Sequence, residues 1–424
     1  MHQAPIGPSS LAPQIDAAAL ALADQVIAWR RDFHAHPELG NREFRTAAIV
    51  AEHLRALGFD EVQTGVAHTG VVGLLKGALP GPVVALRADM DALPVTEQTD
   101  LPFASKVRTE WNGEQVGVMH ACGHDCHVAI LMGVATVLTG LRAQLRGTVK
   151  FLFQPAEEMP PEGEDGGAKM MVEQGAMDNP RPDVVFGLHV IAMLPSGVIG
   201  YRPGPTMASA DSLKITVTGR QTHGAAPWMG VDPIVTSAQI VMGLQTVVSR
   251  QIDITREPAV VTIGSIKGGV RENIIPDSVE MRGTIRSFDE AMRDDIHERI
   301  SYLGEHIARG SRASCEVCIT KRYPVTINDP ALTAAMLPSL MRTAGEHMVH
   351  LVPKVTGSED FSFFQRVSPG LFIFLGVTPQ GADMSKVPSN HSPHFYADEA
   401  AFGVGLRALL NMTCDYLEGG ATGG

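Results

Sequence analysis

The alternation of strand and helix patterns over residues 81–193 is the feature that most limits how this chain can fold. Segments rich in Val, Leu and Phe, typical of buried strands, occur at 81–95, 147–158 and 183–193. Segments typical of helices follow the first two strands, at 126–141 and 167–177, and residues 14–58 are also helical in pattern. This alternation predicts a large α/β domain with a mainly parallel (mixed) sheet flanked by helices.

Residues 206–322 have a different pattern, which predicts a small inserted domain. Alternating strands and two amphipathic helices follow one another in the order β-α-β-β-α-β, which is the order of ferredoxin-like α+β domains. The small domain therefore interrupts the larger one. The predicted domains are a large domain in two parts, 1–205 and 323–424, and the insert at 206–322.

The start of each helix in the insert can also be predicted. Asp232 followed by Pro233 is typical of an N-cap and the first helical position, so the first helix is expected to begin there. The spacing Ser287-x-x-Glu290 is that of a capping box, which predicts the start of the second helix.

Length and charge exclude several classes of protein. At 424 residues the chain is too long for one compact core. Its 46 acidic residues exceed its 34 basic ones, and a surface of net charge −12 repels phosphate, so nucleic acid is not an expected partner. The chain has no apolar run of the roughly 18 residues that span a bilayer, and residues 1–14 lack the features of a signal peptide. We therefore expect a cytoplasmic protein with no membrane partner, which its five cysteines also fit.

The segment MHACGHDCH, residues 119–127, places three histidines and two cysteines within nine positions. Cys122 and His124 lie just before a predicted helix, and thiolate and imidazole together suit a borderline-soft divalent metal such as zinc. Two kinds of site are open at this point. A closed structural site would take further ligands from His120, Cys126 and His127, whereas an open catalytic site would take them from elsewhere.

Candidate ligands also occur where the predicted strands end, which favours the open site. Asp89 and Asp91 end the first strand, Glu157 and Glu158 follow the second, and His189 ends the third. In open α/β sheets functional groups gather at the carboxyl ends of strands. Adjacent glutamates can point different ways, so one can bind a metal while its neighbour holds the attacking water, as metal-assisted hydrolysis requires.

Taken in order, these motifs resemble those of the M20 metallopeptidase family, in its amidohydrolase branch of hippurate hydrolases, N-acyl-amino-acid deacylases and auxin-conjugate hydrolases. The resemblance spans nearly the whole chain, from RRDFHAHPELGNREFRT, LRADMDALPV and MHACGHDCH through FQPAEE, GLHV and THGAAPWMGVDPI to GSEDFS and HSPHFYADE. It implies an α/β domain that binds two divalent metal ions, zinc first, with manganese, cobalt or nickel as alternatives. It also implies that the ferredoxin-like insert is a lid and the dimerisation surface of a homodimer.

The resemblance assigns roles to residues at matching positions. Glu157 would be the general base, and Asp91 would orient a ligand or tune the metal. The chain departs from many family members at Asp89, where they have a histidine ligand, and at His124, near which they use an aspartate. Metal identity therefore stays open, as does whether Cys122 bridges both ions. The implied metal ligands are Cys122, His124, Glu158, His189 and His391.

Further matches concern the substrate. His223, in the loop THGAAPWMG, matches a histidine that stabilises the oxyanion, often in the active site of the partner subunit. Asn273 matches a lid residue that contacts substrate. Gly357 and Ser358 match a cradle for the substrate carboxylate.

We therefore predict a metal-dependent amidohydrolase that cleaves the amide bond of small N-acyl or N-aroyl amino acids, such as hippurate-like compounds, and releases a carboxylate and a free amino acid. The alternative is a dipeptidase or carboxypeptidase of the same family, including cleavage of aroyl-glutamates. A non-catalytic binding protein would lack a base or a ligand, and here every matched position carries a competent side chain. A structural zinc protein would unfold on chelation, whereas the predicted enzyme would lose activity and largely keep its fold.

Overall fold

The computed structural model describes residues 6–158, 160–161 and 163–419, and the chain divides into two compact units. The second unit contains the predicted insert and also the segment 354–362, which the predicted boundaries place with the larger domain. Gly357 and Ser358 therefore belong to the second unit. The first unit comprises 1–204, 327–353 and 363–424, and the second comprises 205–326 and 354–362.

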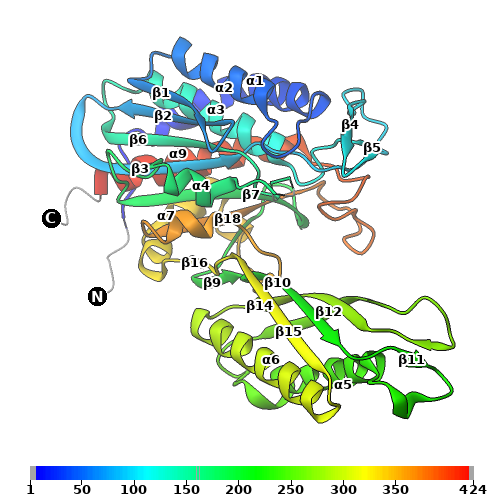
Figure 1. Ribbon diagram of the computed structural model, residues 1–424. Coiled ribbons are helices and arrows are strands. Elements are labelled where there is room, and N and C mark those ends of the chain that lie inside the picture. The colour runs from blue at the N-terminus through cyan, green and yellow to red at the C-terminus, as the bar shows by residue number, and fades with distance from the viewer. Residues whose placement is uncertain (1–5, 159, 162, 420–424) are drawn as a thin grey trace. The chain divides into compact units, whose positions relative to one another are not determined.

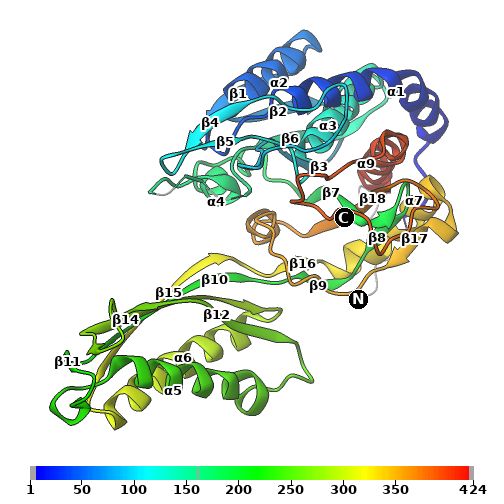
Figure 2. The same ribbon diagram turned by 90° about the vertical axis from the view of Figure 1, so that its right-hand side faces the viewer.

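The first unit is built on an eight-stranded sheet with the strand order β1-β2-β6-β3-β7-β18-β8-β17 (Figures 1 and 2). The four adjacent central strands β6, β3, β7 and β18 are mutually parallel, and the antiparallel pairs lie on either side of them. The predicted α/β class with a mainly parallel sheet is confirmed. The strands are β1 (Glu61–Val66), β2 (Gly70–Lys76), β3 (Leu79–Asp89), β6 (Arg146–Gln154), β7 (Val184–Pro195), β8 (Ile199–Tyr201), β17 (Val349–Leu351) and β18 (Gly370–Thr378), with a separate hairpin of β4 (Arg108–Trp111) and β5 (Glu114–Gly117).

Helices flank this sheet. α3 and α9 both pack against β3 and β7, α1 contacts both of these helices, and α2 packs on β1 and β2. Every residue of α3 from Val128 to Ala135 is apolar and buried, as expected for a helix enclosed between a sheet and other helices. The helices of the first unit are α1 (Ala12–Ala35), α2 (Phe44–Ala56), α3 (His124–Gly140), α4 (Gly167–Glu173), α7 (Pro330–Ala344) and α9 (Phe402–Gly419), with short 3₁₀ turns at η3 (Glu346–Met348) and η4 (Glu399–Ala401).

The ends of the central strands create the place for a site. β3 and β6 stop together, because Asp89 and Gln154 are register partners at their last residues. β7 pairs with β3 only as far as Gly187 but continues to Pro195 alongside β18. The expectation that His189 ends its strand is therefore wrong, since β18 supplies a hydrogen-bonding neighbour beyond the end of β3. His189 nevertheless lies just past the point where β3 stops pairing.

The second unit is a four-stranded antiparallel sheet in the order β12-β14-β10-β15, with α5 and α6 packed on it. The chain order β10-α5-β12-β14-α6-β15 is the predicted ferredoxin-like order (Figure 2). Its elements are β10 (Ala210–Thr218), β11 (Thr222–His223), η1 (Pro227–Met229), α5 (Pro233–Thr246), η2 (Val247–Gln251), β12 (Ala259–Gly268), β13 (Ile274–Ile275), β14 (Ser278–Ser287), α6 (Glu290–Gly310) and β15 (Ser314–Tyr323). Three elements span points where the chain passes between units: β9 (Gly204–Met207), β16 (Thr326–Asn328) and α8 (Ser362–Gln365).

One of the two predicted helix starts in this unit is correct. Asp232 caps α5 by accepting hydrogen bonds from the N–H groups of the second and third helical residues. The capping box at Ser287 is wrong, because Ser287 is the last residue of β14 and pairs with Ala259. The N-cap of α6 is instead Asp289, two residues after Ser287, whose carboxylate accepts from Met292 N at 2.7 Å.

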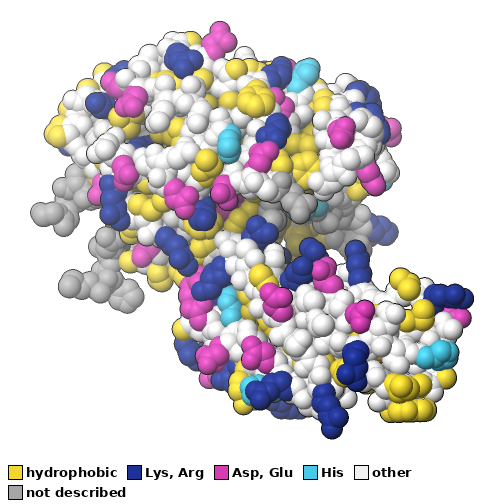
Figure 3. Space-filling view, viewed as in Figure 1, with side chains coloured by type: hydrophobic (Ala, Val, Ile, Leu, Met, Phe, Trp, Pro, Cys, Tyr) yellow, Lys and Arg dark blue, Asp and Glu magenta, His cyan; other side chains and the backbone are white. Residues whose placement is uncertain are grey.

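Two surface properties bear on partners. Among the described residues, no helix is both long and apolar enough to cross a membrane. On the face shown in Figure 3, basic and acidic side chains are interspersed.

Candidate metal centre

The five predicted metal ligands lie together in the first unit, although they come from four separate segments. Cys122 Sγ lies 3.4 Å from His189 Nε2 and 3.3 Å from His391 Nε2. His391 Nε2 in turn lies 2.9 Å from a carboxylate oxygen of Glu158. The donor atoms of Cys122, His124 and His189 are all within 4.8 Å of one another, and so are those of Cys122, Glu158 and His391. Cys122 is thus common to two groups of three donors.

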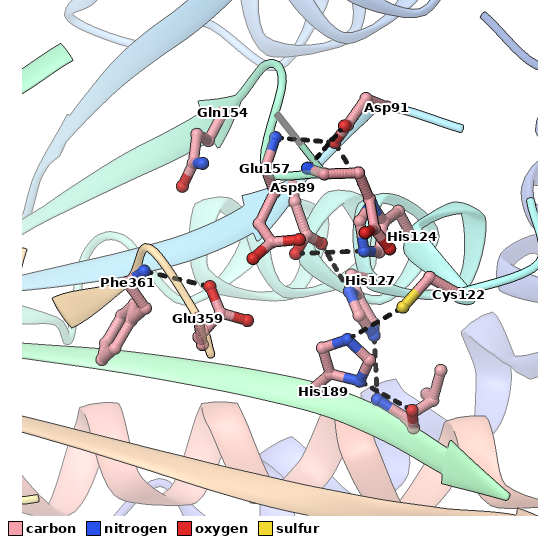
Figure 4. A network of polar contacts seen from close by, with 12 residues as sticks. Asp89, Asp91, Cys122, His124, His127, Gln154, Glu157, His189, Glu359 and Phe361 are labelled. Atoms are coloured by element: carbon pink, nitrogen blue, oxygen red, sulfur yellow. Dashed lines mark hydrogen bonds and ion pairs between the residues drawn. The ribbon is translucent and has the colours of Figure 1, made fainter. Parts of the chain in front are cut away.

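His120, Cys126 and His127 do not belong to these two groups, although His127 forms a third group of possible donors with Asp89 and His124. His127 accepts a hydrogen bond at Nε2 from Val190 N (2.8 Å), and its Nδ1 lies 2.5 Å from Asp89 Oδ1 (Figure 4). Both nitrogens of His127 are therefore already used by protein groups. Cys126 donates its thiol hydrogen to Asp125. This geometry favours the open site over a closed site built from one segment.

The Asp91 carboxylate contacts the His124 ring and the backbone N–H groups of Glu157 and Glu158. One carboxylate oxygen of Asp91 lies 3.2 Å from His124 Nδ1 and accepts from Glu157 N at 3.0 Å, while the other accepts from Glu158 N at 2.9 Å. With the Nδ1 hydrogen directed at Asp91, His124 presents a lone pair at Nε2. That Nε2 atom is buried, makes no hydrogen bond among the described residues, and lies 3.5 Å from a carboxylate oxygen of Asp89.

Gly123 allows the Cys122–His124 segment to approach β7. Its φ of +92° is a conformation that L side chains rarely adopt, and a Cβ there would lie 2.3 Å from Cγ2 of Val190. Val190 follows His189 directly, so the close approach brings the Cys122 sulfur to the His189 ring. The His189 Nδ1–H donates to the Val190 carbonyl at 2.7 Å, which leaves Nε2 facing the sulfur.

The electrostatics of the site favour a bound cation. Burial alone would lower the pKa of His124, but the charges of Asp89 and Asp91 outweigh it and raise that pKa to about 10. Without a metal, the site therefore holds a proton in order to balance its carboxylates. Burial and the neighbouring His127 keep the pKa of His189 well below its usual value, so the His189 ring is neutral, as a ligand must be.

The Cys122 thiol responds to the same charge balance. Burial, followed by the charges of Glu158 and Glu157, raises its pKa well above the usual value. The thiolate is therefore favoured only when a cation offsets this negative charge, so cation binding and loss of the thiol proton are coupled. A sulfur, three imidazoles and a carboxylate form a donor set that fits a borderline-soft divalent ion.

Glu157 lies beside the donors without belonging to either group of three that contains Cys122. A carboxylate oxygen of Glu157 is within 4.8 Å of donor atoms of His124 and Glu158, and its side chain is buried. The backbone N–H of Glu157 donates to the Asp91 carboxylate, as described above. The second histidine of HSPHF, His394, instead directs Nδ1 at the carbonyl of Gln98 (3.0 Å).

Glu43 is a site residue that the sequence reasoning missed. It is fully buried, accepts from Ala156 N at 2.8 Å through one oxygen, and accepts from Thr69 Oγ1 at 2.5 Å through the other. Three successive backbone N–H groups, at 156, 157 and 158, are therefore held by two carboxylates, those of Glu43 and Asp91. Glu43 precedes α2, where an acidic residue is typical of a helix start, so its sequence context did not distinguish it.

The pKa of Glu43 gives a testable pH dependence in the metal-free protein. Burial, and then the charge of Asp91, raises this pKa from 4.5 to about 8. Between these two values the folded state keeps a proton that the unfolded state has lost, so the unfolding free energy falls as pH rises. Glu43→Gln mimics the protonated form and removes this dependence. In thermal melts with a chelator present, the melting temperature of the variant should rise relative to wild type from about pH 5 to about pH 9. A constant difference across that range would contradict the assignment.

Two predicted substrate residues lie next to each other in the second unit. His223 and Ile274 are paired in the short β11–β13 ladder, and Gly224 N donates to the Asn273 carbonyl at 2.8 Å. Ala225 N donates to His223 Nδ1 at 2.9 Å, so the ring hydrogen of neutral His223 is on Nε2. The exposed side chain thus presents a hydrogen-bond donor.

The predicted carboxylate cradle has a basic neighbour that the sequence reasoning also missed. Arg286, on β14, donates from Nη1 to Ser358 Oγ at 2.9 Å, and burial lowers its pKa from the usual value. Gly357 lies alongside, where its carbonyl accepts from Ala208 N at 3.0 Å. An arginine in a strand that alternates in burial has no distinctive signal in sequence, and its link to Ser358 joins segments 72 residues apart.

The chain is similar to known hydrolases over most of its length. Residues 85–414 match the family described as Peptidase family M20/M25/M40. The chain is 43% identical over 389 residues to thermostable carboxypeptidase 1 of Saccharolobus solfataricus (91% of this chain, 94% of the relative). It is 37% identical over 398 residues to N-acetylcysteine deacetylase of Bacillus subtilis (94% and 98%), and 43% identical over 303 residues to N-acyl-L-amino acid amidohydrolase of Geobacillus stearothermophilus (72% and 78%). A crystal structure of a dinuclear metal binding peptidase from the M20 family of Bacillus subtilis superposes with a TM-score of 0.78 at 35% identity (94% and 99%).

Proposed function

This chain belongs to peptidase family M20/M25/M40 and is a metal-dependent hydrolase of amide bonds, and we propose from that premise that its substrates are small N-acyl and N-aroyl amino acids, hippurate-like compounds among them. The products would be a carboxylate and a free amino acid. The observation that carries the proposal is the pair of donor groups around Cys122 with the Glu157 carboxylate beside them. Relatives named as a deacetylase and an amidohydrolase of acylated amino acids support the substrate class.

The two groups of donors would hold two divalent ions. One would be bound by Cys122, His124 and His189, and the other by Cys122, Glu158 and His391. Zinc suits this set of sulfur, nitrogen and oxygen donors best, and manganese, cobalt and nickel are the alternatives. When bound, the ions supply Lewis acidity toward the amide carbonyl and toward water.

Glu157 is the proposed general base. Its carboxylate takes a proton from the attacking water and passes it to the leaving amine nitrogen. Two features support this role. The Glu157 N–H donates to the Asp91 carboxylate, and a carboxylate oxygen of Glu157 lies within 4.8 Å of donor atoms of His124 and Glu158.

Substrate contacts are proposed for the second unit. The Nε2–H of His223 would donate to the oxyanion that forms at the carbonyl, and Asn273 would contact the substrate nearby. The α-carboxylate would be bound by Gly357 and Ser358, with the Arg286 guanidinium supplying positive charge. This recognition requires a free carboxylate on the amino acid that is released.

We also propose a cytoplasmic homodimer that forms through the second unit. All five cysteines are free thiols, which fits a reducing compartment. β12 is an edge strand of its sheet and exposes Val260 and Ile266, while α5 exposes Ile234, Val235 and Met242. Light scattering on the purified protein measures the molar mass and tests the dimer.

A second candidate function is carboxypeptidase activity, which the 43% identity to thermostable carboxypeptidase 1 favours. Incubating the metal-loaded enzyme with hippurate, N-acetyl amino acids and free dipeptides separates the two. We expect turnover of the acylated amino acids and little or none of dipeptides with a free α-amine, measured as release of free amino acid. Turnover of the dipeptides alone would contradict the proposed substrate class.

A further inference from the structure

The side chain of Asn390 lies where three parts of the first unit meet. Its Oδ1 accepts from Ala192 N on β7 at 3.0 Å. Its Nδ2 donates to two carbonyls, that of Cys122 at 3.1 Å and that of Val190 on β7 at 3.0 Å. Each of these contacts is to backbone, so together they constrain the paths of separate chain segments.

The contacts of Asn390 surround the donor atoms of the metal centre. Cys122 carries the sulfur common to both donor groups, and Val190 directly follows His189. His391 directly follows Asn390, its N–H donates to the Ala121 carbonyl at 2.8 Å, and its backbone has a φ of +72°. A positive φ at a residue other than glycine persists only when surrounding contacts hold it. Contacts next to this part of the backbone include the hydrogen bond from the His391 N–H to the Ala121 carbonyl and the three hydrogen bonds of the Asn390 amide.

We propose that Asn390 is a positioning residue that holds Cys122, His189 and His391 in their mutual arrangement before the metal ions bind. The proposal rests on the metal centre proposed above. The three ligands belong to segments 67 to 269 residues apart, so bringing their donor atoms together costs conformational entropy. An amide that links those segments in the folded protein orders them before a metal ion binds. Metal binding then loses less conformational entropy, so the metal affinity is higher.

The chemistry of the position explains why an amide is required. One end must accept a hydrogen from Ala192, and the other must supply two hydrogens to two carbonyls. Only asparagine and glutamine carry both functions on one planar group, and glutamine is longer by a methylene. An aspartate would keep the acceptor but set a negative oxygen against the carbonyls of Cys122 and Val190.

Titration with Co²⁺ tests the proposal in the full-length chain. Wild type, Asn390→Asp and Asn390→Ala are stripped of metal and titrated with Co²⁺, and the thiolate-to-cobalt charge-transfer absorption reports ligation by Cys122. We expect an affinity for Co²⁺ about 10 to 100-fold lower in both variants, with Asn390→Asp the weaker of the two. The metal-free variants should remain folded, although with a lower melting temperature than wild type, because Asn390 lies in a half-buried surface loop and only its three hydrogen bonds are affected. Ser389→Ala, the adjacent exposed position, is the matched control and should bind Co²⁺ as wild type does.

The outcomes separate this inference from the metal centre on which it rests. Wild-type affinity and spectrum in both variants would overturn the positioning role and leave the metal centre standing. Loss of the fold in both metal-free variants would also overturn it, since Asn390 would then be a folding residue. A wild-type protein that shows no thiolate-to-cobalt absorption would overturn the metal centre itself and the inference with it.

Discussion

Replacing Glu157 by glutamine should lower kcat by about 10² to 10⁴-fold while the bound metal content stays at the wild-type level. The substitution keeps the size of the side chain and the backbone hydrogen bond from Glu157 N to Asp91, but removes the group that accepts a proton from water. Because Glu157 lies beside the two proposed ligand sets and belongs to neither, the ligands remain in place. Loss of a general base acts on the chemical step, so KM should change much less than kcat.

Steady-state kinetics with an N-acyl amino acid, together with elemental analysis of the purified variant, measures both quantities. Glu164→Gln is a matched control in the same loop: its carboxylate pairs with Arg42 and is partly exposed, and the variant should retain wild-type kcat. Wild-type turnover by Glu157→Gln would remove Glu157 from the mechanism. A parallel loss of metal would instead assign Glu157 as a ligand.

Cys122→Ala should abolish tight binding at both metal positions and reduce activity on the order of 10³-fold. Its sulfur is the donor common to the group with His124 and His189 and to the group with Glu158 and His391. Metal ions of this kind contribute several kcal/mol to amide hydrolysis, and about 1.4 kcal/mol corresponds to a tenfold change in rate. The large hydrophobic core of the first unit does not depend on the metal, so the variant should remain folded.

Cys126→Ala is the control for this variant. Cys126 lies four residues further on, is buried, and contacts Asp125 rather than any ligand, so this variant should keep its metal and its activity. Metal stoichiometry and thermal melts of both variants, with and without chelator, provide the comparison. If Cys122→Ala or chelation of wild type unfolds the chain, the ions are structural. If Cys122→Ala keeps two ions, the sulfur does not serve both positions.

Much of the site was predictable because strand ends in a parallel sheet meet at one edge. Asp91 and the Glu157–Glu158 pair follow β3 and β6, two adjacent parallel strands that stop in register, so their convergence follows from the strand pattern alone. His189 was predicted by the same argument, although its strand continues past it beside β18. The choice of His391 over His394 came only from the resemblance to a family, since a loop gives no periodicity from which to argue.

The residues that were missed share a different property. Glu43, Arg286 and Asn390 act through hydrogen bonds to partners 113, 72 and up to 268 residues away in the chain. An acidic residue before a helix, an arginine in a strand and an asparagine in a loop are each ordinary in their local setting. Their roles come from partners that no local pattern can identify.

Local interactions account for the α/β alternation, the ferredoxin-like insert, the cap at Asp232 and the clustering of ligand types in MHACGHDCH, because each depends on residues within a few positions of one another. Strand pairing over long distances settled the rest. Pairing with β12 extends β14 through Ser287, so α6 is capped at Asp289 instead. Pairing with β18 extends β7 beyond His189. The folded structure also uses both nitrogens of His127 within the protein, whereas His124 Nε2 makes no hydrogen bond among the described residues and lies 3.5 Å from a carboxylate oxygen of Asp89. Hydrogen bonds of this kind form only once the sheet has brought distant backbone groups within about 3 Å of one another.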